Sequence, residues 1–79
     1  MNTDDYSKAG SQRLFQKGGN NFVIIHKDGK AVAFQLDHNG NVNIVDRQTD
    51  VSFRSTGSSL IAEGWKCVGP GLEYSWLFE

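Results

Sequence analysis

The chain has 79 residues, the size of one small domain spanning 1–79, and its 8 lysines and arginines nearly balance its 9 aspartates and glutamates. A formal net charge of −1 argues against nucleic-acid backbone binding, which usually shows a basic excess or stripe, and the chain has no acidic run to mimic DNA. One cysteine excludes an intramolecular disulfide framework, and the polar, acidic N-terminus and short apolar runs predict a cytoplasmic protein with no membrane contact.

The first 20 residues are polar, and we expect a flexible segment or a short, frayed helix from Thr3 to Gln16. Thr3 suits an N-cap, and the two aspartates after it favour a helix N-terminus. The apolar stripe of this segment is poor, and Gly10 and Ser11 interrupt it. Two glycines and two asparagines at 18–21 then break the segment.

A three-stranded meander follows. Residues 22–27 are rich in β-branched and aromatic types and are followed by Asp28-Gly29, one of the strongest hairpin signals. Residues 30–36 alternate between apolar and smaller or polar side chains, and Asn39-Gly40 supplies a second turn. Residues 42–46 complete the meander.

The next segment has helical spacing of its apolar and small residues at Phe53, Gly57, Leu60, Ile61 and Gly64. It is rich in serine, a weak helix former. We therefore expect either a helix over about 50–63 or a shorter one capped by Ser55 or Thr56, with Gly64 as the C-terminal stop.

The C-terminus reads as a hairpin with a strand from Trp65, a Gly-Pro-Gly turn at 69–71, and a closing strand. Leu72, Tyr74, Trp76 and Phe78 alternate and would share one face of that strand. The predicted fold is α+β, in the order β-β-β-α-β-β. It consists of an antiparallel sheet of about five strands with one helix packed on one face.

The segment Leu60-Ile61-Ala62-Glu63-Gly64-Trp65, followed by Val68 and the terminal Leu77-Phe78, resembles a small domain-of-unknown-function family of bacteria and their phages. The resemblance covers residues 60–79, about a quarter of the chain. The serine-rich stretch before Leu60 and the two earlier hairpins depart from the family pattern. The resemblance implies a fold and a core role for Trp65, but no activity.

His26, His38 and Cys67 are the only soft metal ligands, and no two of them form a close local pair of the kind that zinc sites use. Cys67 and His26 would make a conceivable nucleophile–base pair across a sheet. We favour structural roles for all three, and we expect no catalytic residue, no metal and no cofactor.

A platform of exposed aromatic residues for single-stranded nucleic acid is the main alternative to protein binding. Its candidates are Phe15, Phe22, Phe34, Tyr74 and Trp76. Core packing explains the same residues better, and the basic residues look dispersed rather than striped. The dispersed set is Arg13, Lys17, Arg47, Arg54 and Lys66.

The hypothesis we carry forward is a non-enzymatic protein-interaction module, encoded by a phage or mobile element. It would bind and modulate, by inhibition, a bacterial host or defence protein complex. Tyr6, Arg47 and Arg54 are the predicted partner-binding residues, because they lie outside the strands expected to be buried. A monomer and a homodimer paired through a sheet edge both remain open.

Overall fold

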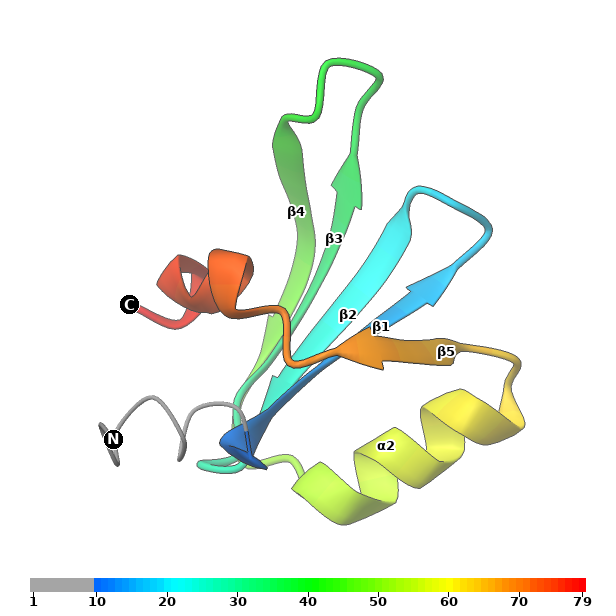
Figure 1. The fold of residues 1–79 in the computed structure, drawn as a ribbon. Helices are drawn as coiled ribbons and strands as arrows, with labels where there is room; N and C mark the ends of the chain where they lie inside the picture. The colour runs from blue at the N-terminus through cyan, green and yellow to red at the C-terminus, as the bar shows by residue number, and fades with distance from the viewer. Residues whose placement is uncertain (1–9) are drawn as a thin grey trace.

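The computed structural model describes residues 10–79, and a five-stranded antiparallel sheet forms its centre (Figure 1). The first four strands form a meander, after which one helix brings the chain back to add the last strand beside the first, in the order β4-β3-β2-β1-β5. The strands are β1 (Gln12–Lys17), β2 (Asn21–His26), β3 (Ala31–Leu36), β4 (Val42–Gln48) and β5 (Lys66–Gly69). The helices are α2 (Phe53–Ala62) and the C-terminal 3-10 helix η1 (Leu72–Phe78). The predicted α+β class and five-stranded antiparallel sheet are confirmed.

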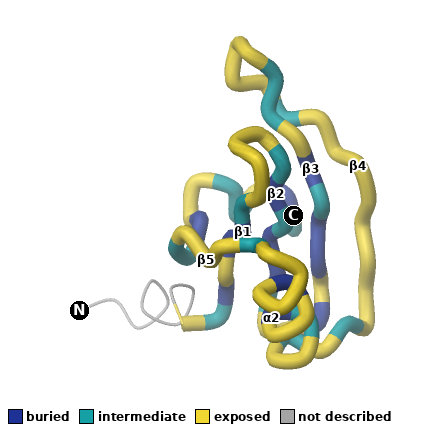
Figure 2. The backbone as a smooth tube through the Cα atoms, turned by 90° about the vertical axis from the view of Figure 1, so that its right-hand side faces the viewer, coloured by how far each residue is buried: buried dark blue, intermediate teal, exposed yellow. Residues whose placement is uncertain are grey.

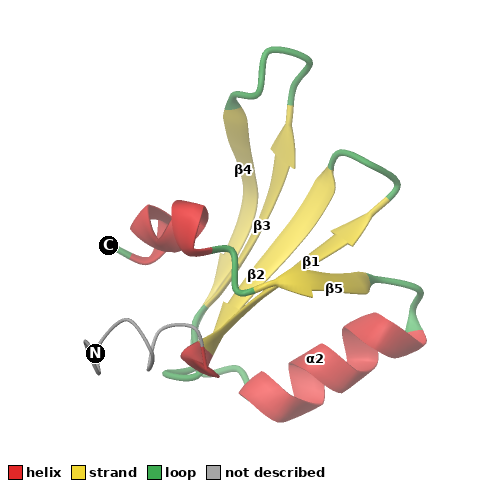
Figure 3. Ribbon diagram, in the orientation of Figure 1, coloured by secondary structure: helices red, strands yellow, loops and turns green. Residues whose placement is uncertain are grey.

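The sheet has a hydrophobic core on each of its two faces, and Figure 3 shows a helix on each side of it. Neighbouring residues in a strand point to opposite faces, so Leu14 joins the core under η1 while Phe15 joins the core under α2. The core under η1 contains Leu14, Phe22, Ile24, Val32, Phe34 and Leu77. The core under α2 contains Phe15, Ile25, Ala31 and Leu60.

The expected N-terminal helix is wrong over 12–16, because these residues form β1. Leu14 and Phe15 are adjacent and both buried, so β1 needs apolar residues on both faces and shows no alternation. The strand is central in this half of the sheet, between β2 and β5. Thr3 and the rest of 1–9 lie outside the described residues.

The meander of β2, β3 and β4 is confirmed within a few residues of the predicted bounds. Gly29 and Gly40 have φ values of 101° and 83°, the left-handed region that the Asp-Gly and Asn-Gly turns require. The helix follows at 53–62, close to the longer of the two predicted alternatives. Its N-cap is Ser52, whose Oγ accepts a hydrogen bond from the backbone N–H of Ser55 at 3.2 Å.

The predicted closing strand of the C-terminal hairpin is wrong, since residues 72–78 form η1. Gly71 turns the chain away from β5 with a φ of 61°, and the N–H of Tyr74 donates to its carbonyl at 2.9 Å. In a strand, Leu77 and Tyr74 would point to opposite faces. As a 3-10 helix, the segment instead packs Tyr74, Leu77 and Phe78 together on the sheet. No helix in the described part of the chain has the length and apolar character needed to span a membrane.

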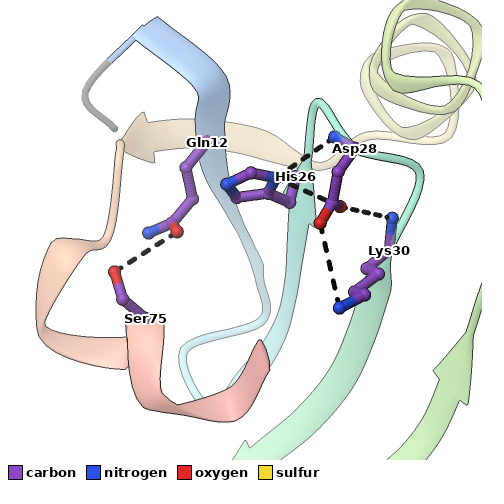
Figure 4. Close-up of polar contacts among 5 residues, drawn as sticks. All are labelled: Gln12, His26, Asp28, Lys30 and Ser75. Atoms are coloured by element: carbon purple, nitrogen blue, oxygen red, sulfur yellow. Dashed lines mark hydrogen bonds and ion pairs between the residues drawn. The ribbon is translucent and has the colours of Figure 1, made fainter. Parts of the chain in front are cut away.

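Gln12 fixes the entry to η1 from the far end of the chain (Figure 4). Its side chain is buried, and its Nε2 donates to the carbonyls of Pro70 at 2.7 Å and Gly71 at 3.0 Å. Its Oε1 accepts a hydrogen bond from the Ser75 hydroxyl at 3.3 Å. The first strand therefore positions the helix that covers one face of the sheet.

Candidate interaction surfaces

Arg47 and Arg54, the predicted contact residues within 10–79, lie on different surfaces. Tyr6 lies outside the described residues. Arg47 on β4 is exposed, and its Nη1 donates to the carbonyl of Leu77 at 2.8 Å, so this arginine also holds the end of η1. Arg54 is exposed on α2, which packs on the opposite face of the sheet.

Cys67 and His26 do not meet. Cys67 is exposed on β5 at one edge of the sheet, and β1 lies between β5 and the strand that carries His26. His38 is an exposed residue of the turn between β3 and β4. Within residues 10–79, no three His, Cys, Asp or Glu side chains are grouped so that they would hold a metal ion.

His26, the last residue of β2, contacts the turn between β2 and β3 instead (Figure 4). Its Nδ1 lies 3.1 Å from both the backbone nitrogen and the Oδ1 of Asp28. Its ring also contacts the Phe78 ring edge-on, with the ring centroids 5.4 Å apart. Asp28 also accepts from the N–H of Lys30 at 3.2 Å. These contacts give His26 a structural role in joining the turn to η1.

The aromatic residues proposed as a nucleic-acid platform are mostly core. Phe15, Phe22 and Phe34 are buried, and Phe22 stacks on Phe34 with ring centroids 5.3 Å apart. Tyr74 packs against the same two rings. Trp76 is 51% exposed, so one aromatic ring of the five is left open to solvent.

Among residues 10–79, no helix covers the part of the sheet nearest β4 on the α2 side. Two adjoining hollows, of about 240 and 180 Å³, share Val23 and Ala33, and the smaller one reaches from α2 to β4. Ala31 and Ala33 occupy two of the three β3 positions on this face, where larger side chains would fill the space. We call these hollows the apolar trough. Its apolar lining residues include Val23, Ala31, Ala33, Val45, Leu60 and Trp65, and its polar lining residues are Lys17, Asn21, Gln35, Asp46, Gln48 and Thr56.

The trough adjoins an open sheet edge. β4 ends the sheet order and is exposed along nearly its whole length, as Figure 2 shows. The register shifts between Ala33 and Phe34, which pair with Asp46 and Ile44, so Val45 is the extra residue of a β-bulge. Val45 is 63% exposed and forms one wall of the trough.

The opposite flank of α2 carries a second hollow, of about 520 Å³, which we call the basic hollow. Arg13 from β1, Lys27 from the turn after β2 and Arg54 from α2 line it, and no Asp or Glu among residues 10–79 does. The guanidinium of Arg13 lies over the Phe53 ring, 5.5 Å from its centroid. Ile61, Gly57 and two serines complete the lining together with Gly10.

Sequence reasoning missed both hollows. Arg13 and Arg54 were predicted to be dispersed, whereas the fold gathers them with Lys27. In the β1–β2 pairing Arg13 lies opposite Ile25, two residues before Lys27, which places Arg13 close to Lys27. The helix expected over 3–16 would not pair with β2, so the prediction could not bring these two residues together. The Gly18-Gly19 pair, which joins the two strands, was the available hairpin signal.

Comparisons with protein-family models, with curated proteins and with solved structures find no match to this chain.

Proposed function

We propose that this protein is a non-enzymatic protein-interaction module that receives an apolar segment of another protein in the trough beside β4. The observation that carries the proposal is the position of the trough, which runs from α2 to an open sheet edge. Surfaces that combine an apolar hollow with an unpaired strand are typical places for a partner segment to bind.

The exposure of Val45 supports this proposal. A bulged valine on an edge strand presents apolar surface to water, which is unfavourable unless something covers it. Val45 is 63% exposed, so covering it completely would be worth about 1–2 kcal/mol. A partner side chain placed between Val45 and Trp65 would bury both residues at once.

The chemistry of β4 favours another protein over a second copy of this chain. Asn43, Asp46 and Gln48 pair with the β3 residues of the α2 side, so they occupy that face of β4. Asp46 and Gln48 already line the trough, so a symmetric pairing of two β4 edges would bring a second copy of these groups, with its Asp46 carboxylate, to the same edge, where like charges repel. A segment of another protein carries no second Asp46 and can offer hydrogen-bond donors to this carboxylate.

The sharper form of the proposal is that the partner belongs to a bacterial complex which this protein, encoded by a phage or mobile element, inhibits. The resemblance of residues 60–79 to a bacterial and phage family is its support. Trp65, the core residue in that resemblance, packs against the α2-side core and lines the trough.

The test is affinity capture from bacterial lysate with the wild-type chain and two variants, Val45→Asp and Val68→Asp. The control is matched because Val68 is also exposed, at 49%, but lies on β5 at the other edge of the sheet. We expect a stoichiometric partner that the wild type and Val68→Asp retain and Val45→Asp loses.

Equal capture by both variants would refute the trough as the binding surface. Sedimentation of the purified chain provides the check on self-association: a dimer that Val45→Asp dissociates would identify a second copy as the occupant and overturn the proposal. Thermal melts of all three proteins would show that each is folded.

A further inference from the structure

We propose that the basic hollow binds an acidic segment of the partner protein, one whose carboxylates alternate with apolar side chains. This inference rests on the proposed function, since it assigns chemistry to a second part of the same protein partner. It concerns a different surface, because the trough and the basic hollow lie on opposite flanks of α2.

The charge of the hollow is uncompensated within the described chain. The ion pairs among residues 10–79 all involve Asp28, which is near His26 and Lys30, and none reaches Arg13, Lys27 or Arg54. Three cations from three separate elements thus face one hollow of a protein whose overall charge is −1. Like charges gathered in this way repel, so a carboxylate placed among them gains from all three.

The contacts of Arg13 show how the hollow is organised. Its guanidinium lies 5.5 Å from the centroid of the Phe53 ring, which orients a planar group well suited to pair with a carboxylate through two hydrogen bonds. The hydroxyls of Ser52 and Ser58 add further hydrogen-bond donors to the lining. The positive charge is therefore accompanied by directional donors.

The apolar part of the hollow selects a peptide rather than a bare anion. Ile61 is 56% exposed and Phe53 is half-buried, and both line the hollow beside the cations. A volume of about 520 Å³ exceeds what one carboxylate fills. Aliphatic side chains that flank the carboxylates would cover Ile61 and replace the water next to it.

Nucleic acid fits these features less well. Single-stranded nucleic acid needs a basic groove that follows the backbone together with free aromatic faces for stacking. Here the cations surround one hollow, and Arg13 already lies over one face of Phe53. Phosphate and single-stranded DNA serve accordingly as competing probes in the test.

The experiment uses the full chain, labelled with ¹⁵N, and a capped peptide of alternating glutamate and leucine. The matched probe replaces glutamate with glutamine, and inorganic phosphate and a short oligothymidine are titrated separately. At low salt we expect the glutamate peptide to shift the signals of Arg13, Lys27 and Arg54, and to bind at least tenfold more tightly than the glutamine peptide. Raising the salt to physiological strength should weaken binding, because these exposed charges are screened over about 8 Å.

Arg54→Glu should weaken binding of the glutamate peptide by at least tenfold, whereas Lys66→Glu, an equal change of charge on β5, should leave it within about twofold. Equal losses in the two variants would refute the hollow as the site. Equal binding of the two peptides, or the same signals shifted by phosphate or oligothymidine but not by the glutamate peptide, would also overturn the inference.

Val45→Asp separates this inference from the proposed function. The variant should still bind the glutamate peptide with unchanged affinity while losing the captured partner. If the peptide binds as expected but no partner depends on Val45, the proposed trough fails and the basic hollow stands. If capture depends on Val45 but the peptide does not bind, the inference fails and the trough stands.

Discussion

Replacing Gln12 with leucine tests whether the first strand anchors the C-terminal helix. Leucine has a similar volume and leaves no large cavity, but it removes the donor to the carbonyls of Pro70 and Gly71 and the acceptor for the Ser75 hydroxyl. The amide is buried and these bonds join segments about sixty residues apart, at separations of 58, 59 and 63. The change should loosen η1 from the sheet.

The expected cost follows from the burial of each group. The bond to Gly71 is buried, and an unsatisfied buried carbonyl costs about 1–3 kcal/mol. The bonds to Pro70 and Ser75 are partly buried, and each contributes about 0.5–1.5 kcal/mol. Leucine recovers some of this loss through apolar burial, so we expect the free energy of unfolding to fall by about 2–4 kcal/mol. That is a large part of the total for a domain of this size, about 4–12 kcal/mol at 0.05–0.15 kcal/mol per residue.

Urea unfolding followed by tryptophan fluorescence measures this change. With an m-value of about 1–2 kcal/mol/M, the midpoint should fall by about 2 M. Gln16→Leu is the matched control on the same strand, because Gln16 Nε2 donates to Gly19 O in an exposed bond at 2.8 Å. Hydrogen exchange at the Tyr74 amide, which donates to Gly71 O, reports η1 directly. If Gln12→Leu and Gln16→Leu unfolded at the same urea concentration, the anchoring role of Gln12 would be wrong.

Two further predictions concern turns. Gly71→Ala should destabilise the protein, by about 1–2 kcal/mol for its left-handed conformation and about 1–3 kcal/mol for overpacking, because the added Cβ would lie 2.8 Å from Leu14 Cβ. Gly19 is also left-handed but has open space around it, so Gly19→Ala measures the cost of the backbone conformation alone. Equal urea midpoints for the two variants would contradict the predicted clash with Leu14. The N–H of Asn41 donates to the Asp37 carboxylate and holds the pKa of that group below its usual value, with help from Asn39. A carboxyl whose pKa is lower in the folded state stabilises the fold at pH values above its unfolded pKa, and this stabilisation is lost as the pH falls. Wild type should therefore lose more stability than Asp37→Asn on acidification below about pH 4. Parallel losses in the two proteins would contradict this.

The parts of the fold that sequence predicted are those fixed by local chemistry. Asp28-Gly29 and Asn39-Gly40 determine two tight turns, and strands of β-branched and aromatic residues flank them, so the meander needs no distant information. Gly64 likewise ends α2, with a φ of 96° and its N–H donating to Ile61 O.

The parts that sequence missed depend on distant neighbours. β1 is buried on both faces only because β5 and both helices come from later in the chain, so its Leu14-Phe15 pair shows neither strand nor helix periodicity. Residues 72–78 are too few for their apolar pattern to distinguish a strand, with a period of two, from a 3-10 helix, with a period of three. The helical form buries Leu77 completely, on the same core as Tyr74 and Phe78.

The candidate surfaces show the same limit. Arg54 could be named from sequence as an exposed cation, but its neighbours Arg13 and Lys27 depend on the β1–β2 register. Arg47 was named for the same reason, yet its bond to Leu77 O gives it a structural task. Weaker partner binding by an Arg47 variant would therefore count as evidence of contact only if the variant remained as stable as wild type.

The trough lies beside α2, over β3 and β4. η1 covers one face of the sheet, while the ten residues of α2 pack on the other face near β2 and β5 and leave the face over β3 and β4 open. Ala31 and Ala33 of β3 are too small to fill this space, and Asp46 and Gln48 of β4 line it. An apolar segment supplied by another protein would cover the part of the sheet that residues 10–79 leave open, which is why the trough rather than either sheet edge alone carries the proposed function.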